Sequence, residues 1–197
     1  INSSSVNFKL PVINRKLKNF KSEFETKIRW LNHACLIIES QNFKIATDPW
    51  LIGPAFSNGW WLKHNSPLDS FEEINSCDMI FISHNHPDHL HPETLEKISK
   101  NVQIITPNFP TGSTVRYLKD IGFKNILELN LYQTLINQKN ELSLTVVKSG
   151  DFRDDSGIII QIGMFTILLT VDSNYIDFWR FPKKLDLIAS SFAGGAS

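Results

Sequence analysis

The chain has 197 residues, of which 42% are hydrophobic and 20% charged, and its 20 basic residues balance its 20 acidic ones. This length and composition are typical of one globular domain that buries about 70% of its unfolded surface. The balanced charge excludes a broad electrostatic attraction to nucleic acid or to an anionic membrane, so we expect neither as a partner.

The cysteines bear on the cellular compartment of the protein, and the chain ends bear on whether the domain is complete. Cys35 and Cys77 each lie in an apolar, strand-like run, which fits buried thiols in a reducing compartment better than a disulfide framework. No run reaches the roughly 18 apolar residues needed to span a bilayer, and we see no signal peptide pattern. We therefore expect a cytoplasmic protein. The chain begins without a methionine and ends in the glycine-rich segment 193–197, so we also expect that a C-terminal part of the domain is missing.

The first predicted elements are strands. Residues 1–24 are rich in Asn, Ser and Lys and are expected to be a leader or linker, whereas residues 25–197 are expected to form the domain. Apolar residues alternate over residues 28–38 and again over 43–47, which predicts a β-hairpin that turns at 40–42 and ends at Asp48. Residues 50–70 show no clean period and predict a long loop of the kind that lines a site.

The middle of the chain predicts alternating strands and helices. We expect strands at 77–83 and 102–106, a helix opened by Pro92 and running to about residue 99, and a helix at 113–121 that Gly122 closes. Strands then dominate the rest, and they are predicted at residues 125–129, 142–148, 157–162, 165–171 and 185–190.

A cluster of imidazoles and carboxylates follows the apolar run 77–83: His84, His86, Asp88 and His89. A protein core does not tolerate such groups without partners, and a metal ion supplies one most simply. His84 and His86 are two residues apart in an extended loop and so point to one ion, while Asp88 and His89 reach a second ion after the following turn. The segment therefore predicts two adjacent metal sites, against the alternative of a solvated histidine-rich loop.

The pattern His84-x-His86-x-Asp88-His89 resembles the signature motif of the metallo-β-lactamase superfamily. The resemblance implies an α/β (α+β) fold, namely an αββα sandwich with the metals at one edge of two packed sheets. Asp48 matches the earlier aspartate motif of that superfamily. A carboxylate at this place would accept the second N–H groups of ligating histidines and orient them; the alternative is a turn-capping aspartate.

Within the superfamily, the segments 48–56, 59–62 and 192–197 resemble the CMP-N-acetylneuraminate hydroxylase branch. Members of that branch join an N-terminal Rieske iron–sulfur domain to this fold and hydroxylate the N-acetyl group of a CMP-linked sialic acid. A Rieske centre needs two Cys-His boxes, and this sequence has none. The resemblance therefore leaves three alternatives: an external Rieske or other electron-transfer protein as a partner, an omitted segment that carries the Rieske domain, or a scaffold that has been turned to other chemistry.

The remaining metal ligands depart from the superfamily pattern, because no histidine follows His91. By the resemblance, Asp151 occupies the place of the usual third histidine, with Asp154 or Asp155 as alternatives, and Asp172 supplies the carboxylate that bridges the metals. Asp151 is equally well explained as a surface turn residue. A ligand set this rich in carboxylates suits iron or manganese at least as well as zinc, so we expect two divalent ions and favour iron.

Other residues complete the predicted site. We expect Asp88, His33 and His64 to act in catalysis, although each of the last two is as readily explained as an ordinary hydrogen-bonded or solvated histidine. Trp50, Trp60 and Trp61 are expected either to stack on a base or sugar ring of a small-molecule substrate, such as a CMP-sugar, or to form a small core of the loop.

Three functions are compatible with these expectations. The first is a non-haem iron oxygenase resembling the hydroxylase branch and acting on a nucleotide-linked sugar or a similar metabolite. The second is a zinc or manganese hydrolase of an ester, lactone or phosphodiester, in which a metal-bound water has its pKa lowered to about 7. The third is a metal-binding scaffold without catalysis.

Overall fold

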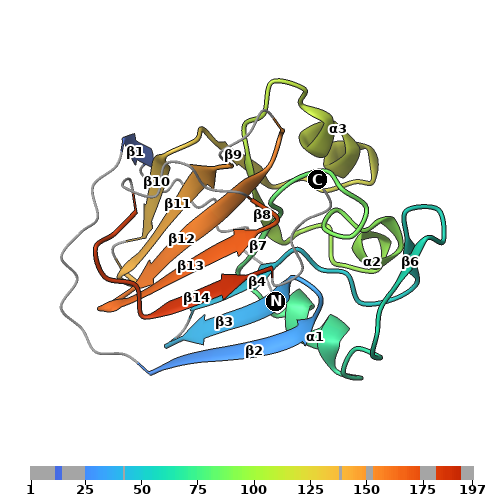
Figure 1. Cartoon of the computed structure of the whole chain (residues 1–197), viewed down its shortest axis with the longest axis horizontal. Helices are drawn as coiled ribbons and strands as arrows, with labels where there is room; N and C mark the ends of the chain where they lie inside the picture. Colours follow the sequence, from blue (N-terminus) through green and yellow to red (C-terminus); the bar gives the residue numbers. More distant parts are fainter. Residues whose placement is uncertain are drawn as a thin grey trace, which may run out of the picture.

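The computed structural model describes residues 12–14, 25–41, 43–137, 139–149, 153–173 and 181–191. In these residues two six-stranded sheets face each other (Figure 1). The order in one sheet is β2 (Thr26–Asn32), β3 (Cys35–Ser40), β4 (Phe43–Thr47), β7 (Met79–Phe81), β8 (Gln103–Pro107) and β9 (Ile126–Leu129). The order in the other is β1 (Val12–Asn14), β10 (Gln133–Asn137), β11 (Leu142–Lys148), β12 (Ser156–Ile162), β13 (Phe165–Val171) and β14 (Leu187–Ser190).

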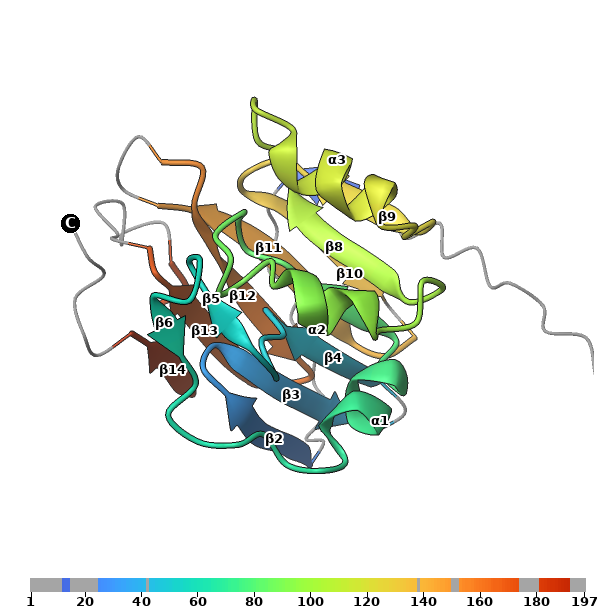
Figure 2. The ribbon, with the colours of Figure 1, turned by 90° about the vertical axis from the view of Figure 1, so that its right-hand side faces the viewer.

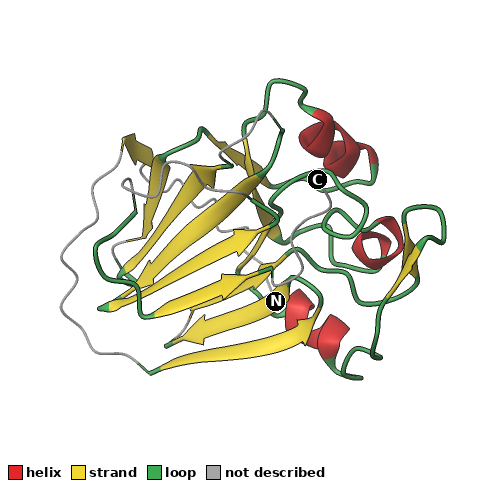
Figure 3. Cartoon of the chain, in the orientation of Figure 1, coloured by secondary structure: helices red, strands yellow, loops and turns green. Residues whose placement is uncertain are grey.

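The three described helices are α1 (Ser70–Asn75), α2 (Pro92–Glu96) and α3 (Ser113–Asp120). All three lie on the outer face of the first sheet (Figures 2 and 3). A short ribbon of β5 (Pro54–Ala55) and β6 (Trp60–Trp61) lies in the loop that was predicted over residues 50–70. The expected α+β fold with two packed sheets is confirmed.

Two apolar layers explain why these strands stay together. One layer fills the space between the sheets, and it includes Ile38, Ile45, Phe81, Ile105, Leu144, Val146, Ile158 and Ile160. The other seals the helices onto the first sheet, and it includes Ile37, Ala46, Ile74, Ile80, Leu95, Ile104 and Leu118. Strands buried on both faces read as nearly continuous apolar runs, which is the pattern of β7 and β8.

The structure corrects the first predicted hairpin. The alternation over residues 28–38 predicted one strand, but the chain turns at His33 and Ala34 and forms β2 and β3 instead. His33 has a φ of 42°, in the left-handed region that side chains other than glycine seldom adopt. Alternation continues through such a tight turn, and neither Gly nor Pro marks it, so the period alone did not reveal it.

Other elements agree with the expectations to within a few residues or were missed. The predicted helix before Gly122 is α3, and Gly122 has a φ of 97° where the helix ends. We did not predict α1, β10 or the strand β1, which lies in the expected leader and pairs antiparallel with β10. Among the described residues, no helix is long and apolar enough to cross a membrane.

Candidate metal centre

The predicted metal residues lie where two neighbouring parallel strands end. β4 and β7 pair in parallel, with Thr47 opposite Phe81, so the residues that follow these two strands come to one edge of the sheet. Asp48 follows β4 and donates its backbone N–H to the carbonyl of Phe81 at 2.9 Å, while Ser83 and the histidine motif follow β7. The carboxyl ends of parallel strands are the usual place for a binding site in such sheets.

Asp48 is completely buried and holds two parts of the motif. Its carboxylate accepts hydrogen bonds from the backbone N–H and the hydroxyl of Ser83, both at 2.7 Å, and lies 3.1 Å from Nδ1 of His89. The Ser83 hydroxyl gives its proton to Asp48, so it can only accept from Nδ1 of His84, 2.9 Å away. Both rings therefore carry the hydrogen on Nδ1 and present Nε2 to the site, as the predicted orienting role of Asp48 requires.

His84, His86 and Asp172 form the first group of candidate ligands. Nε2 of His84 lies 2.8 Å from Nδ1 of His86 and 3.9 Å from a carboxylate oxygen of Asp172. One ligand atom from each of the three residues lies within 4.8 Å of the others, which is close enough for one ion. His84 is buried, whereas the side chain of Asp172 is 32% exposed.

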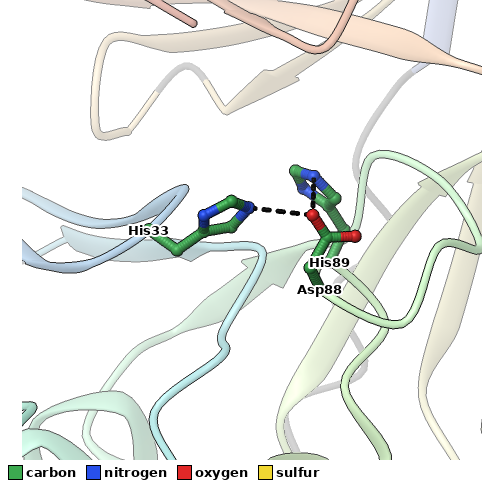
Figure 4. Close-up of side chains that lie close together, drawn as sticks. All are labelled: His33, Asp88 and His89. Carbon is green, nitrogen blue, oxygen red and sulfur yellow. Dashed lines mark hydrogen bonds and ion pairs between the residues drawn. The ribbon is translucent and has the colours of Figure 1, made fainter. Parts of the chain in front are cut away.

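His33, Asp88 and His89 form the second group (Figure 4). Oδ2 of Asp88 lies 3.1 Å from Nε2 of His33 and 3.5 Å from Nε2 of His89. Asp172 lies between the groups, because its Oδ2 is also 3.3 Å from Nε2 of His89. The structure thus places Asp172 where a bridging carboxylate would have to be.

The donor set fits a pair of divalent cations. Oδ1 of Asp88 is buried without a hydrogen-bond partner, and buried polar atoms are rarely left in that state. Nε2 of His89 is buried between two carboxylate oxygens, Oδ2 of Asp172 at 3.3 Å and Oδ2 of Asp88 at 3.5 Å. Each group combines imidazole nitrogen with carboxylate oxygen, which is a ligand chemistry that iron, manganese and zinc accept.

Opposite pKa shifts show how strongly these groups interact. Burial lowers the pKa of His84 to about 3, helped by the neighbouring His89 and His86, so its ring is neutral. For His89 burial acts the same way, but hydrogen bonds to Asp172 and Asp48 outweigh it and raise the pKa to about 10. The same contact with His89 lowers the pKa of Asp172 to about 2. The carboxylates thus hold a proton on His89, where a cation would satisfy them equally well.

Left-handed backbone marks three of the segments that carry candidate ligands. His33, Asp48 and Val171, the residue before Asp172, have φ values of 42°, 33° and 54°. For a β-branched residue such as Val171 this conformation is a true outlier, and it accompanies an irregularity in the pairing of β13 with β14. Conformations of this kind persist where the surrounding structure imposes them, and they cluster at functional sites.

Asp155 and Ser156 bring the second sheet to the motif. Oδ1 of Asp155 lies 3.4 Å from Nδ1 of His84, and the hydroxyl of Ser156 donates to the carbonyl of Ser83 at 2.9 Å. Burial raises the pKa of Asp155 to about 7. Of the two alternatives to Asp151, Asp154 instead accepts a hydrogen bond from Thr111. Asp151 itself lies outside the described residues.

The other predicted residues line two cavities beside the centre. One, of about 490 Å³, is lined by His33, Asp172 and Thr47, among others. The second, of about 510 Å³, is lined by Trp60, Trp61, Lys63 and His64, among others. Trp30 and His33 line both cavities, so the two cavities adjoin each other at the turn between β2 and β3.

The tryptophans and His64 differ in their surroundings. Trp60 and Trp61 are 49% and 67% exposed, whereas Trp50 is buried, so of these three tryptophans only Trp50 belongs to a core. His64 belongs to neither ligand group of the described residues, and its predicted catalytic role stays a prediction. Sequence reasoning missed Ser83 and Ser156; the signal for Ser83 was a polar residue directly between an apolar strand and the motif.

Known proteins similar to this chain fall into two sets. Cytidine monophosphate-N-acetylneuraminic acid hydroxylases from Xenopus laevis and Mus musculus are 36% and 35% identical to it over 184 residues, which is 88% of this chain. The chain spans about 30% of the length of these relatives.

The similar solved structures include CmlA, a diiron β-hydroxylase from Streptomyces venezuelae, with a TM-score of 0.66 and 21% identity over 85% of this chain and 34% of CmlA. An isothiocyanate hydrolase from Delia radicum gut bacteria has a TM-score of 0.62 and 17% identity over 82% of this chain and 69% of that one. At such identities these two structures bear on the fold alone. The family model of the beta-lactamase superfamily domain matches residues 27–153. The chain therefore belongs to the beta-lactamase superfamily, and it has the metallo-β-lactamase fold.

Proposed function

We propose that this chain is the metal-binding catalytic domain of an oxygenase that hydroxylates a nucleotide-linked sugar or a similar small metabolite. The observation that carries the proposal is the mixed ligand set, in which Asp88 and Asp172 stand beside three motif histidines at the end of β7. The identity of about 35% with cytidine monophosphate-N-acetylneuraminic acid hydroxylases over most of this chain supports the same reaction class.

Two divalent ions, with iron favoured, would be held by this edge of the sheet. His84, His86 and Asp172 would bind one ion, Asp88 and His89 the other, and Asp172 would reach both. Bound there, iron would supply the activation of dioxygen. Asp48 and Ser83 would hold the rings of His84 and His89 so that Nε2 of each faces the ions.

The reaction class requires a source of electrons. Insertion of one oxygen atom of O₂ into a C–H bond uses two electrons and two protons and releases the second oxygen as water. The two cysteines, Cys35 and Cys77, are buried, and neither belongs to a Cys-His box of the kind that holds a Rieske centre. We therefore propose that an external iron–sulfur or other electron-transfer protein supplies the electrons.

The two cavities offer a place for a small-molecule substrate. Their volumes of about 490 and 510 Å³ lie in the range usual for metabolite pockets. In the second cavity, exposed Trp60 and Trp61 present aromatic faces beside Lys63, a combination suited to a ring that carries a phosphate. In this arrangement the ring would bind against β6, and the reacting carbon would lie near His33 and Asp172.

Metal analysis tests the proposal directly. Protein purified without oxygen and without added metal is expected to hold about two irons per chain, and the His84→Ala and Asp172→Ala variants are expected to lose them. Nucleotide sugars would then be assayed with a chemical reductant and O₂. A native chain with two zinc ions that hydrolyses an ester, lactone or phosphodiester would contradict the oxygenase and favour the hydrolase. A chain that holds metal but turns over neither substrate class would favour the scaffold.

A further inference from the structure

His33 enters the metal centre from a braced turn and not from a strand. Its backbone N–H donates to the side chain of Asn32 at 3.0 Å, and its carbonyl accepts from the indole N–H of Trp30 at 2.8 Å. These two bonds fix the backbone of His33, which has a left-handed φ, within the turn between β2 and β3. The side chain of Asn32 also donates to the carbonyl of His64 at 2.8 Å and to Ser66 at 3.1 Å, which ties the turn to the loop over the site.

The imidazole ring of His33 is also held in place. It packs edge-on against Trp50, with ring centroids 5.1 Å apart, and against His89, with centroids 5.2 Å apart. Trp50 is itself buried, and its indole N–H donates to the carbonyl of Gly53 at 3.0 Å. The side chain of His33 remains only 28% exposed. A ring fixed by backbone and packing contacts has lost its rotamer freedom before it meets a ligand, which is how binding groups are preorganised.

The distances around Asp88 match a shared ion better than a hydrogen bond alone. Ligand atoms about 2.1 Å from one ion lie about 3.0 Å apart at right angles and about 3.4 Å apart in a tetrahedron. Oδ2 of Asp88 is 3.1 Å from Nε2 of His33 and 3.5 Å from Nε2 of His89, and Figure 4 shows both nitrogens turned toward it. A hydrogen bond from His33 would account for the first distance, but it would leave Oδ1 of Asp88 buried without a partner and would not explain why Nε2 of His89 also faces Oδ2 of Asp88.

From this geometry we infer that His33 is a direct ligand of the ion held by Asp88 and His89, so that the turn between β2 and β3 completes the second metal position. The assignment rests on the proposed metal centre, and it replaces the catalytic role that the sequence suggested for His33. Two segments more than 50 residues apart thereby become one site, with Asp88 and His89 from the loop after β7 and His33 from the first turn of the same sheet. The fold around this turn, including Asn32 and Trp30, serves to aim the ring.

Metal binding to two His33 variants tests the assignment. His33→Gln keeps an N–H donor for Asp88 but replaces imidazole with an amide, a poor ligand, whereas His33→Ala removes both. Co²⁺ is titrated into metal-free protein under nitrogen and followed by calorimetry and visible absorption. The wild-type chain is expected to bind two ions, and both variants are expected to keep one and to bind the second roughly 100-fold more weakly. Added imidazole is expected to restore the absorption of the second ion in His33→Ala.

The control is Gln41→Ala, which changes a residue with a φ of 51° in the next turn of the same sheet. This variant is expected to bind two ions as the wild type does, and circular dichroism checks the fold of all variants. Two tightly bound ions in His33→Gln would overturn the assignment and leave His33 as a hydrogen-bond donor. A wild-type chain that binds no Co²⁺ would overturn the proposed metal centre itself, and the role of His33 with it.

Discussion

Oδ1 of Asp155 lies 3.4 Å from Nδ1 of His84, while the other nitrogen of that ring faces His86. Asp155 thus lies behind a candidate ligand and comes from the opposite sheet. Because groups that orient a ligating histidine typically change metal affinity 10- to 100-fold, Asp155→Ala is expected to weaken the ion at His84 by about tenfold or more. Competition with a chromophoric chelator measures the change.

The matched control for Asp155 is its neighbour Asp154, which accepts a hydrogen bond from the exposed Thr111. Asp154→Asn removes a charge only one residue away, and it is expected to leave metal affinity within about twofold. If both variants weakened binding equally, the effect would be a general one of charge, and the contact with His84 would have no special role.

Asp48 is expected to be essential to stability even without metal. It is completely buried and satisfies two donors of Ser83 as well as Nδ1 of His89. Removal of one partner from such a buried, charged network costs roughly 3–5 kcal/mol, so Asp48→Ala is expected to lower the free energy of unfolding by about that much. Asp48→Asn, which keeps an acceptor and tolerates the left-handed backbone, is expected to lose less. Unfolding in guanidinium chloride measures the free energy of unfolding of both variants, provided that the m-value stays the same. Equal losses in the two variants would contradict this account.

Alanine variants of two tryptophans near the site are expected to differ in stability: one changes the free energy of unfolding little, and the other lowers it strongly. Trp61 is 67% exposed on β6, so Trp61→Ala is expected to change the free energy of unfolding by less than about 0.5 kcal/mol while it weakens binding of a nucleotide sugar. Trp50 is buried, stacks on His91 and contacts His33, so Trp50→Ala is expected to cost about 3–5 kcal/mol. Thermal unfolding and fluorescence titration separate the two effects. Unchanged ligand affinity in Trp61→Ala would remove β6 from the substrate site.

The two thiols are expected to be inert in the folded protein. Burial raises the pKa of Cys77 to about 12 and that of Cys35 well above its usual value. At pH 8 a thiol reagent is therefore expected to label neither cysteine in the native chain and both in guanidinium chloride. Since the folded pKa lies above the unfolded value of 9.0, the folded state keeps these protons where the unfolded chain loses them, and stability falls as the pH rises from about 9 toward 12. Rapid labelling of the native protein would contradict the burial of both residues.

Several elements could be predicted because their cause is local. The strands at residues 142–148 and 165–171 have the predicted bounds, since alternate residues of each strand are apolar and pack into the layer between the two sheets. The short helix after His91 begins at Pro92 as expected, and the ring of His91 caps it by accepting the N–H of Thr94. α1 was missed because it has six residues within a long loop, too few for a helical period to stand out.

The sequence by itself determined the chemistry of the motif and the place of Asp48, because strand, loop and ligand spacing are local and the parallel strands that carry them are marked by apolar runs. Only the tertiary structure decided which distant groups join it. Asp172 and Asp155 come from the facing sheet, and His33 comes from a turn that strand alternation concealed. The physical reason is that packing of the two sheets and the left-handed turn at His33 set these distances, and neither leaves a periodic mark along the chain.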